Sequence, residues 1–194
     1  MNDWNRSYWE GRWERGETGW DMGQVSPPLQ HFIDGLKDRD QRILIPGCGN
    51  AYEGEYLHQQ GFRNVFLLDV SEQALAAFHD RFPDFPEEHL VRADFFEHTK
   101  TYDLILEQTF FCAIDPALRP KYVRQAAGLL VPGGLLVGLL WSVPMHEDRP
   151  PFGGSIEEYR SLFEPYFEVE VLEEATNSIA PRLGREVFVQ FRKK

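Results

Sequence analysis

Two closely spaced glycines and an aspartate about twenty residues later have the clearest potential for chemistry in this chain. Gly47 and Gly49 follow the short apolar run 43–46, and Asp69 ends a second apolar run, 65–68. Glycines let the backbone turn sharply at the end of a strand and let a ligand approach it closely. A carboxylate at the tip of the next strand can accept hydrogen bonds from a ribose. The pattern predicts a binding site for a nucleoside.

The residue three positions after Gly49 indicates which nucleoside binds. A dinucleotide-binding fingerprint, Gly-x-Gly-x-x-Gly, needs a small third residue where the helix packs closely against the strand. Tyr52 stands at that position, which argues against NAD and FAD. The chain also lacks Gly-x-x-x-x-Gly-Lys-Ser/Thr, so a P-loop nucleotide site is not expected. A glycine loop without phosphate-binding features, followed by a ribose-binding acid, favours S-adenosylmethionine (SAM).

Four of the five tryptophans lie within the first twenty positions. Trp9 and Trp13 are four residues apart, so they share a face if this segment is helical, and Trp20 follows them. Indoles facing the cofactor would attract the sulfonium of SAM by about 0.5–2 kcal/mol for each well-placed ring. We therefore expect residues 1–36 to form an N-terminal aromatic lid over the cofactor site. A lid helix that packs its rings on the core is the alternative, and the aromatic residues alone leave both open.

Apolar runs and helical spacings alternate along the rest of the chain. Strands are expected at residues 43–46, 65–69, 90–93, 103–109 and 135–141, with an antiparallel pair at 169–172 and 187–191. Helices are expected between the first two strands and at residues 29–36, 72–82, 116–130 and 156–163. This alternation predicts an α/β fold, in which a mostly parallel, Rossmann-like sheet carries helices on both faces.

The carboxyl ends of the parallel strands meet at one edge of such a sheet, and ligands bind there. Besides Gly47 and Asp69, the predicted edge carries Asp94 with Phe95 after the third strand and Gln108 at the end of the fourth. A carboxylate at the tip of a parallel strand seldom has a structural role alone. Asp69 and Asp94 are therefore the best-placed candidates for binding the cofactor.

The composition narrows the class of protein. A length of 194 residues predicts one domain, residues 1–194, and the net charge of -11 disfavours nonspecific binding to nucleic acids or anionic membranes. The longest apolar run, 133–141, is too short to span a bilayer, and no apolar signal segment is visible at the start. The two cysteines show neither metal-site spacing nor a disulfide framework. We expect a cytoplasmic monomer that acts on a small molecule and binds no metal.

Three groups of residues together resemble a known family. They are Trp9-x3-Trp13-x6-Trp20-Asp21, then Ile45-Pro46-Gly47-Cys48-Gly49, then Phe110-Phe111-Cys112-Ala113-Ile114 with Arg119-Pro120 soon after. The combination resembles the thiopurine S-methyltransferase family, and within it the plant halide/thiol methyltransferases, over nearly the whole chain. The resemblance implies a class I SAM-dependent methyltransferase with a seven-stranded sheet whose last strand is antiparallel. Members of this family methylate small soft nucleophiles such as thiols, thiopurines, halides and chalcogen anions.

The resemblance also implies a set of cofactor contacts. The indoles would close over SAM, Gly47 would lie against its methionine end, and Asp69 would bind the ribose hydroxyls. Asp94 would accept a hydrogen bond from the exocyclic amine of adenine, and the ring of Phe95 would lie against the adenine face. The cofactor-binding residues expected for SAM and its product S-adenosylhomocysteine are Trp9, Trp13, Trp20, Gly47, Asp69, Asp94, Phe95 and Gln108.

At two positions the chain departs from the halide/thiol branch. That branch has an acid followed by a tyrosine at the tip of the fourth strand, whereas this chain has Glu107 followed by Gln108. Asn50-Ala51 stands where those relatives tend to have further glycines. A phenol facing the substrate is therefore not carried over to Gln108.

Methyl transfer from a sulfonium mainly requires that the nucleophile be positioned and that water be excluded. A thiolate or a halide is already a strong nucleophile, so no base is obligatory and the catalytic residues stay unassigned. His146, in the loop after the fifth strand, could deprotonate a thiol, although an exposed loop histidine more often has no role. Phe110, Phe111 and Trp141, with the loop 144–154, could form an apolar wall for the acceptor or be ordinary core.

Arg182 and Arg185, before the last strand, could meet an anionic substrate or could be solvated surface residues. Two other classes of function remain open. A SAM-binding module without activity would share the cofactor features but would yield no methylated product. A nicotinamide-dependent oxidoreductase is less compatible with Tyr52.

Overall fold

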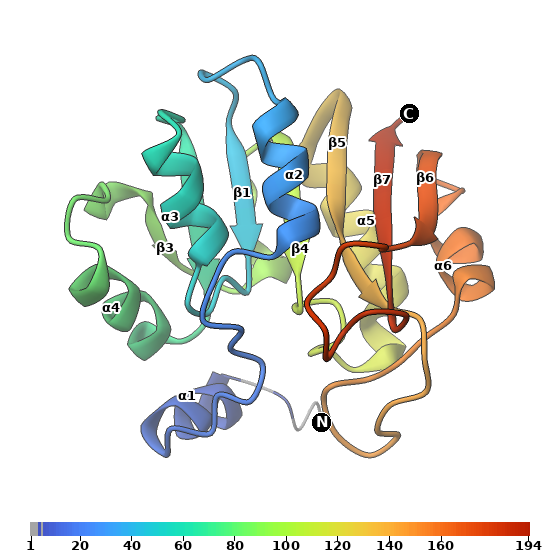
Figure 1. Cartoon of the computed structure of the whole chain (residues 1–194), viewed down its shortest axis with the longest axis horizontal. Helices are drawn as coiled ribbons and strands as arrows, with labels where there is room; N and C mark the ends of the chain where they lie inside the picture. The colour runs from blue at the N-terminus through green and yellow to red at the C-terminus, as the bar shows by residue number, and fades with distance from the viewer. Residues whose placement is uncertain (1–3, 5) are drawn as a thin grey trace.

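The computed structural model describes Trp4 and residues 6–194, and a seven-stranded sheet forms its centre (Figure 1). The strand order is β3-β2-β1-β4-β5-β7-β6, and β7 runs antiparallel to both of its neighbours while the other pairs are parallel. The predicted α/β fold class, with its antiparallel last strand, is confirmed. The strands are β1 Ile43–Pro46, β2 Val65–Asp69, β3 Leu90–Arg92, β4 Tyr102–Gln108, β5 Leu130–Trp141, β6 Phe167–Glu174 and β7 Glu186–Lys193.

The direction in which strands are added reverses at β1. The chain first places β2 and β3 on one side of β1 and then returns to place β4 on the other side. Ile43 of β1 pairs with Val65 on one side and with Leu104 on the other. The loops that leave β1 and β4 diverge at such a switch point, and the crevice between them is where ligands bind in open α/β sheets.

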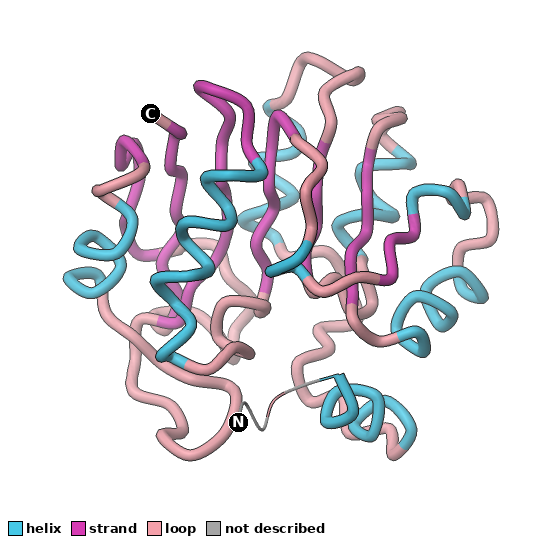
Figure 2. Tube along the Cα trace, turned by 180° about the vertical axis from the view of Figure 1, so that it is seen from behind, coloured by secondary structure: helices cyan, strands magenta, loops and turns pink. Residues whose placement is uncertain are grey.

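Helices cover both faces of the sheet (Figures 1 and 2). One hydrophobic cluster joins α2, α3 and α4 to one face, and a second joins α5 and α6 to the other. Helix α1 belongs to neither layer. The helices are α1 Arg6–Glu14, α2 Pro27–Gly35, α3 Tyr52–Gln59, α4 Glu72–Arg81, α5 Arg119–Leu129 and α6 Ile156–Phe163, with short 3-10 turns η1 Glu87–His89, η2 Phe95–Glu97 and η3 Pro116–Leu118.

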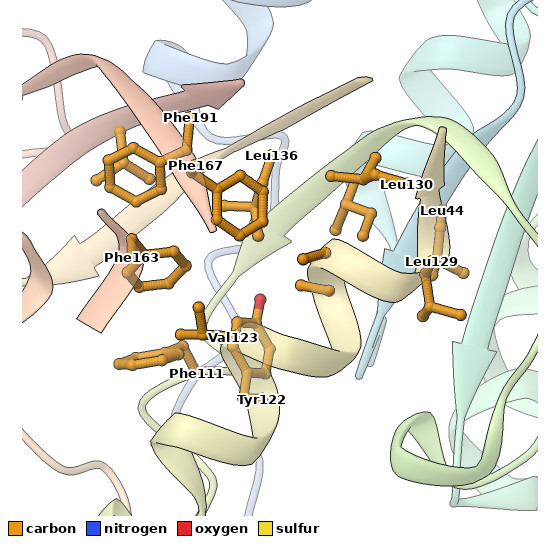
Figure 3. Close-up of a cluster of buried hydrophobic side chains, with 14 of the residues drawn as sticks. Leu44, Phe111, Tyr122, Val123, Leu129, Leu130, Leu136, Phe163, Phe167 and Phe191 are labelled. Atoms are coloured by element: carbon orange, nitrogen blue, oxygen red, sulfur yellow. The ribbon is translucent and has the colours of Figure 1, made fainter. Parts of the chain in front are cut away.

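Aromatic rings fill the cluster beneath α5 and α6 (Figure 3). Phe163 lies between Phe167 and Phe191, with ring centroids 5.8 Å and 4.6 Å away. Phe111, from the segment after β4, contacts Tyr122 of α5 edge to face at 5.0 Å. This packing ties the tip of β4 to the core, so that the tip is held in a fixed position.

Helix α1 lies beyond the carboxyl ends of the parallel strands (Figure 1). It packs against α4. Helix α2, which the predicted lid 1–36 includes, instead covers the sheet with Leu29 and Ile33, both fully buried. Of the predicted lid, residues 1–3 and 5 lie outside the described residues. The part that overhangs the strand tips therefore ends before α2.

The structure differs from the predicted elements mainly at β5. We expected a turn at residues 131–134 and a strand from residue 135, but β5 begins at Leu130, which pairs with Tyr102. The register then shifts, and Leu135 pairs with Leu104. Gly133, with φ +76°, accommodates the extra residues. The chain does turn near residues 131–134, as predicted, but this turn is an irregularity within β5 and not a loop before it.

In the part of the chain that the structure describes, no helix combines the length and apolar character needed to cross a bilayer.

Candidate active site at the carboxyl ends of the strands

The loop after β1 has an unusual backbone that its glycines permit. Gly47 and Gly49 have φ values of +55° and +51°, and Ala51 follows with +50°. A side chain at Gly47 would overlap the ring of Phe110, which packs directly on the loop from the end of β4. Glycine is therefore required at position 47 for two reasons, the left-handed backbone and the close approach of Phe110.

Asp69, the last residue of β2, fixes this loop from the side. Its Oδ2 accepts a hydrogen bond from the Gly49 amide at 3.0 Å, and its Oδ1 accepts one from the Ser71 amide at 2.9 Å. The residue is only 8% exposed, and burial raises the pKa of its carboxyl although the backbone hydrogen bonds oppose this. A carboxylate has about four acceptor positions, so two bonds leave capacity for hydroxyl groups of a ligand.

The indoles of the N-terminal segment gather above the same loop. Trp20 contacts Trp9 and Trp13 edge to face, with ring centroids 5.6 Å and 6.0 Å apart. A methyl group on Gly49 would lie 3.5 Å from Nε1 of Trp20 and 3.9 Å from Trp13. The three tryptophans thus form one cluster, and two of them lie against the glycine loop. The guanidinium of Arg12 lies 5.4 Å from the Trp20 ring centroid, so it already covers part of that indole.

A carboxylate of α1 holds this segment on α4. Glu10 accepts a hydrogen bond from the Ser71 hydroxyl at 3.0 Å and another from the Glu72 amide at 2.9 Å. Ser71 is the N-cap of α4 and accepts a hydrogen bond from the Ala74 amide. Glu10 therefore binds the positive end of the α4 dipole and satisfies one of its free amides.

The two residues expected to bind adenine have different environments. Asp94 is exposed at the end of β3, and its Oδ1 accepts a hydrogen bond from the Phe96 amide at 2.8 Å. Phe95 is only 1% exposed, and its ring is stacked on Tyr122 at 5.1 Å. The Phe95 ring is thus packed in the core with one face on Tyr122, and its contact with adenine stays a prediction.

A small cavity separates the lid segment from the strand tips. It has a volume of about 40 Å³. Its walls are Trp20, Asp21, Met22 and Gln24 from the lid, Ile45, Cys48, Asn50 and Ala51 after β1, Tyr52 and Glu53 of α3, and Gln108 with Thr109 after β4. Nε2 of Gln108 donates to the sulfur of Met22 at 3.1 Å. Its Oε1 is buried and has no hydrogen-bond partner among the described residues, so the cavity presents an unused acceptor.

On the other side of the β4 tip, two guanidinium groups face one indole. The Cζ atoms of Arg182 and Arg185 each lie 5.2 Å from the ring centroid of Trp141. Arg182 is 7% exposed, so the interpretation as a solvated surface residue is wrong for it. It forms an ion pair with Glu186 at 3.0 Å and donates to the Trp20 carbonyl at 3.2 Å. Arg182 thereby joins the lid to the last strand.

The other candidates for the acceptor side are less well placed. Phe111 is buried in the core below α5, so it cannot form a wall of the site. His146 is exposed in its loop. Trp141 is half-buried beneath the arginines and remains a candidate.

From the sequence, we did not identify Glu10 and Glu107 as residues of this region, and we did not predict that Arg182 is buried. Glu107 is fully buried next to Gln108, and burial raises the pKa of its carboxyl to about 7. An acid that directly continues the apolar run Leu104-Ile105-Leu106 was a signal for a buried charge. Glu10 and Arg182 gave no comparable signal, because Glu10 binds Ser71 and Arg182 binds the Trp20 carbonyl, and both partners lie far away in the sequence.

The sheet with its antiparallel β7, the glycine loop beside the switch point and Asp69 at the tip of β2 define a class I SAM-dependent methyltransferase. A solved structure with the same fold is the 1,6-didemethyltoxoflavin-N1-methyltransferase of Burkholderia thailandensis with bound 1,6-didemethyltoxoflavin and S-adenosylhomocysteine. The TM-score is 0.78 at 19% identity, over 97% of this chain and 87% of that one.

The chain belongs to the thiopurine S-methyltransferase family, whose pattern it matches over residues 4–190. It is 32% identical to a protein of Arabidopsis thaliana named probable thiol methyltransferase 2, over 95% of this chain and 84% of that protein. The identity to thiocyanate methyltransferase 1 of Brassica oleracea is also 32%, with the same coverage. The family expected from the three sequence motifs is confirmed.

Proposed function

We propose that this methyltransferase transfers the methyl group of SAM to a small soft nucleophile, either a thiol or an anion such as thiocyanate, iodide or bisulfide. Support comes from the relatives named for thiol and thiocyanate methylation. The observation that carries the proposal is the pair of guanidinium groups over Trp141 beside the lid. Cations above an indole face favour an anionic acceptor, since they offer charge and a polarisable apolar surface together.

We propose that SAM lies along the strand tips under the lid formed by α1 and the segment up to α2. Gly47 would contact its methionine end, Asp69 its ribose and Asp94 the amine of adenine. The free Oε1 of Gln108 and the carboxylates of Asp21 and Glu53 suit the α-ammonium group, because all are acceptors. Trp9, Trp13 and Trp20 would cover the cofactor.

The size of the cavity adds a requirement for motion. About 40 Å³ lies between the lid and the strand tips, whereas ligand sites typically measure about 300–1,000 Å³. This cavity is too small for the methionine end of SAM, so we propose that the lid segment moves outward before the cofactor enters. The contacts made by Glu10 and Arg182 are the ones that such a movement would break.

SAM supplies a methyl group on a positively charged sulfur. A lone pair of the nucleophile forms the new bond to carbon while the carbon–sulfur bond breaks, and its electron pair stays on sulfur. With an anionic acceptor, the two opposite charges disappear together and no proton moves. The residues of this chain therefore have to hold the acceptor near Arg182 and Arg185, exclude water, and keep both reactants in line.

The direct test is an S-adenosylhomocysteine release assay with iodide, thiocyanate, bisulfide, an aromatic thiol and a thiopurine offered side by side. We expect turnover with at least one soft anion or thiolate, and a higher KM for that anion in the variant Arg185→Gln. Arg149→Gln, which removes an exposed arginine of the loop 144–154, is the matched control. Saturable quenching of tryptophan fluorescence by S-adenosylhomocysteine without turnover of any acceptor would point to a non-catalytic SAM-binding module. Binding of NADH in place of S-adenosylhomocysteine would point to an oxidoreductase.

We also propose that the protein acts as a monomer in the cytoplasm. Sedimentation or light scattering checks the first statement, and cell fractionation checks the second.

A further inference from the structure

Glu107 is buried at the end of β4, and each of its carboxylate oxygens is engaged. Oε1 accepts hydrogen bonds from the backbone amides of Phe110 and Phe111, both at 2.8 Å. Oε2 accepts one from the hydroxyl of Tyr122, on α5, at 2.7 Å. The neighbouring strand makes room for the side chain, because a Cβ atom at Gly138 of β5 would overlap Glu107. A buried carboxylate is stable only with such partners.

The segment that Glu107 holds, residues 109–112, presses on the cofactor loop. Phe110 packs against Gly47 so closely that no side chain fits there. Thr109 has φ +61°, a backbone conformation that a β-branched residue adopts only where its surroundings impose it. The thiol of Cys112 donates to the Thr109 carbonyl at 3.2 Å. The position of the ring of Phe110 therefore depends on the bonds that its amide makes to Glu107.

We infer that Glu107 is a positioning residue for methyl transfer: as a carboxylate, it fixes the segment 109–112 and, through Phe110, the loop at Gly47 that receives the cofactor. This inference rests on the proposed site for SAM. It adds a residue that touches neither SAM nor acceptor. It also predicts that cofactor binding depends on one buried proton.

The groups around Glu107 explain how that proton would be controlled. Burial raises the pKa of Glu107 to about 7, and the hydrogen bonds from Tyr122, Phe111 and Phe110 lower it. The other titratable group facing it is the thiol of Cys112, whose pKa burial and Glu107 both raise. The nearby cations are Arg182, which acts on Cys112 from the segment before β7, and Arg119 of α5, which lies 4.9 Å from the ring centroid of Phe111. A movement of the segment that leaves Glu107 buried loses the bonds that lower its pKa, so ionisation above about pH 7 opposes this movement. Global unfolding has the opposite dependence, because it exposes the carboxylate to water.

The first test is the dissociation constant for S-adenosylhomocysteine, measured by tryptophan fluorescence between pH 5.5 and pH 8. We expect binding by the unaltered chain to tighten roughly ten-fold as the pH rises through about 7, because ionic hydrogen bonds are about twice as strong as neutral ones. Glu107→Gln keeps the shape and the acceptor for both amides but cannot ionise. Its binding should be weak and should lack the change near pH 7. Thermal unfolding at pH 8 checks the fold of this variant, which should be at least as stable, since burial favours the neutral form.

The second test shifts the midpoint pH of the change in S-adenosylhomocysteine affinity. Tyr122→Phe removes a donor that lowers the pKa of Glu107, so the pH at which binding tightens should move upward. Tyr159→Phe is the matched control: its hydroxyl is also buried, but it donates to the Trp141 carbonyl, and the midpoint should stay in place. An unchanged pH profile in Glu107→Gln, or equal midpoints in the two tyrosine variants, would overturn the inference. If the unaltered chain binds no S-adenosylhomocysteine at any pH, the proposed function fails and the inference fails with it.

Discussion

Replacing Glu10 by glutamine should loosen the lid without touching the cofactor pocket. The carboxylate of Glu10 makes two hydrogen bonds at the start of α4, to the Ser71 hydroxyl and to the Glu72 amide. Glutamine can still accept from the amide, but the charge at the helix N-terminus is lost. That charge contributes about 0.3–1 kcal/mol at a largely exposed helix end. The weaker hydrogen bonds of a neutral group add roughly 1 kcal/mol.

A loss of about 1.5 kcal/mol corresponds to roughly a ten-fold shift toward the open lid. If S-adenosylhomocysteine binds under the closed lid, its affinity falls by up to the same factor, so we expect a three- to ten-fold higher dissociation constant. Titration of tryptophan fluorescence measures this directly. The effect should shrink in high salt, because the interaction with the helix end is screened.

Glu14→Gln provides the matched control on the same helix. Glu14, the last residue of α1, accepts a hydrogen bond from the exposed side chain of Gln73 at 3.3 Å, and no described backbone amide of α4 donates to it. Its replacement should change the affinity less than two-fold. Equal affinity of the Glu10 variant and the unaltered chain, or equal weakening in both variants, would refute the role assigned to Glu10.

Three further results are expected. Asp69→Ala should weaken binding of S-adenosylhomocysteine by about 1–3 kcal/mol, seen by calorimetry, because a charged acceptor is lost; unchanged affinity would remove Asp69 from the site. Arg182→Met should lower the free energy of unfolding by about 3–5 kcal/mol in urea titrations, because Glu186 is then buried without its partner; the double variant with Glu186→Gln should regain most of this, and no recovery would contradict the reasoning. The unfolded pKa of Glu107 is near 4.5 and the folded one about 7, so its ionisation destabilises the fold as pH rises between these values. When the pH is lowered from 8 to 5, the free energy of unfolding of the unaltered chain should therefore rise by up to roughly 3 kcal/mol more than that of Glu107→Gln. Parallel curves of the free energy of unfolding against pH for the two proteins would exclude this.

The sequence was enough to predict the sheet and its ligand-binding edge, because both depend on local patterns. Apolar runs ended by Gly47 or Asp69 are short-range signals, and the alternation of strands and helices restricts their arrangement. The start of β5 was placed five residues too late, since a turn signal at Gly133 does not show that pairing continues through it. Pairing between strands is a tertiary property.

The site was harder to predict, because burial decides the role of several residues. Phe95 follows a strand tip, as an adenine-binding residue would, and the sequence does not show that one face of its ring is stacked on Tyr122 and that the residue is buried. Arg182 lies in a segment with Pro181 and Gly184 that suggests a surface turn, yet it is enclosed by Glu186, Trp20 and Trp141. Glu186 is only four residues away from Arg182, but the residues that bury these two side chains, Tyr122 for Phe95 and Trp20 and Trp141 for Arg182, come from other parts of the chain, so no local window of sequence predicts the burial.

The antiparallel direction of β7 has a consequence for how the protein is made. Its first residue, Glu186, lies at the same edge as the last residues of the parallel strands, and it brings Arg182 there too. Trp20 leaves the ribosome long before the arginine that binds its carbonyl, because 162 positions separate the two residues. A polypeptide interrupted before residue 182 would carry the glycine loop and every indole of the lid, yet it would lack the anchor that completes the site.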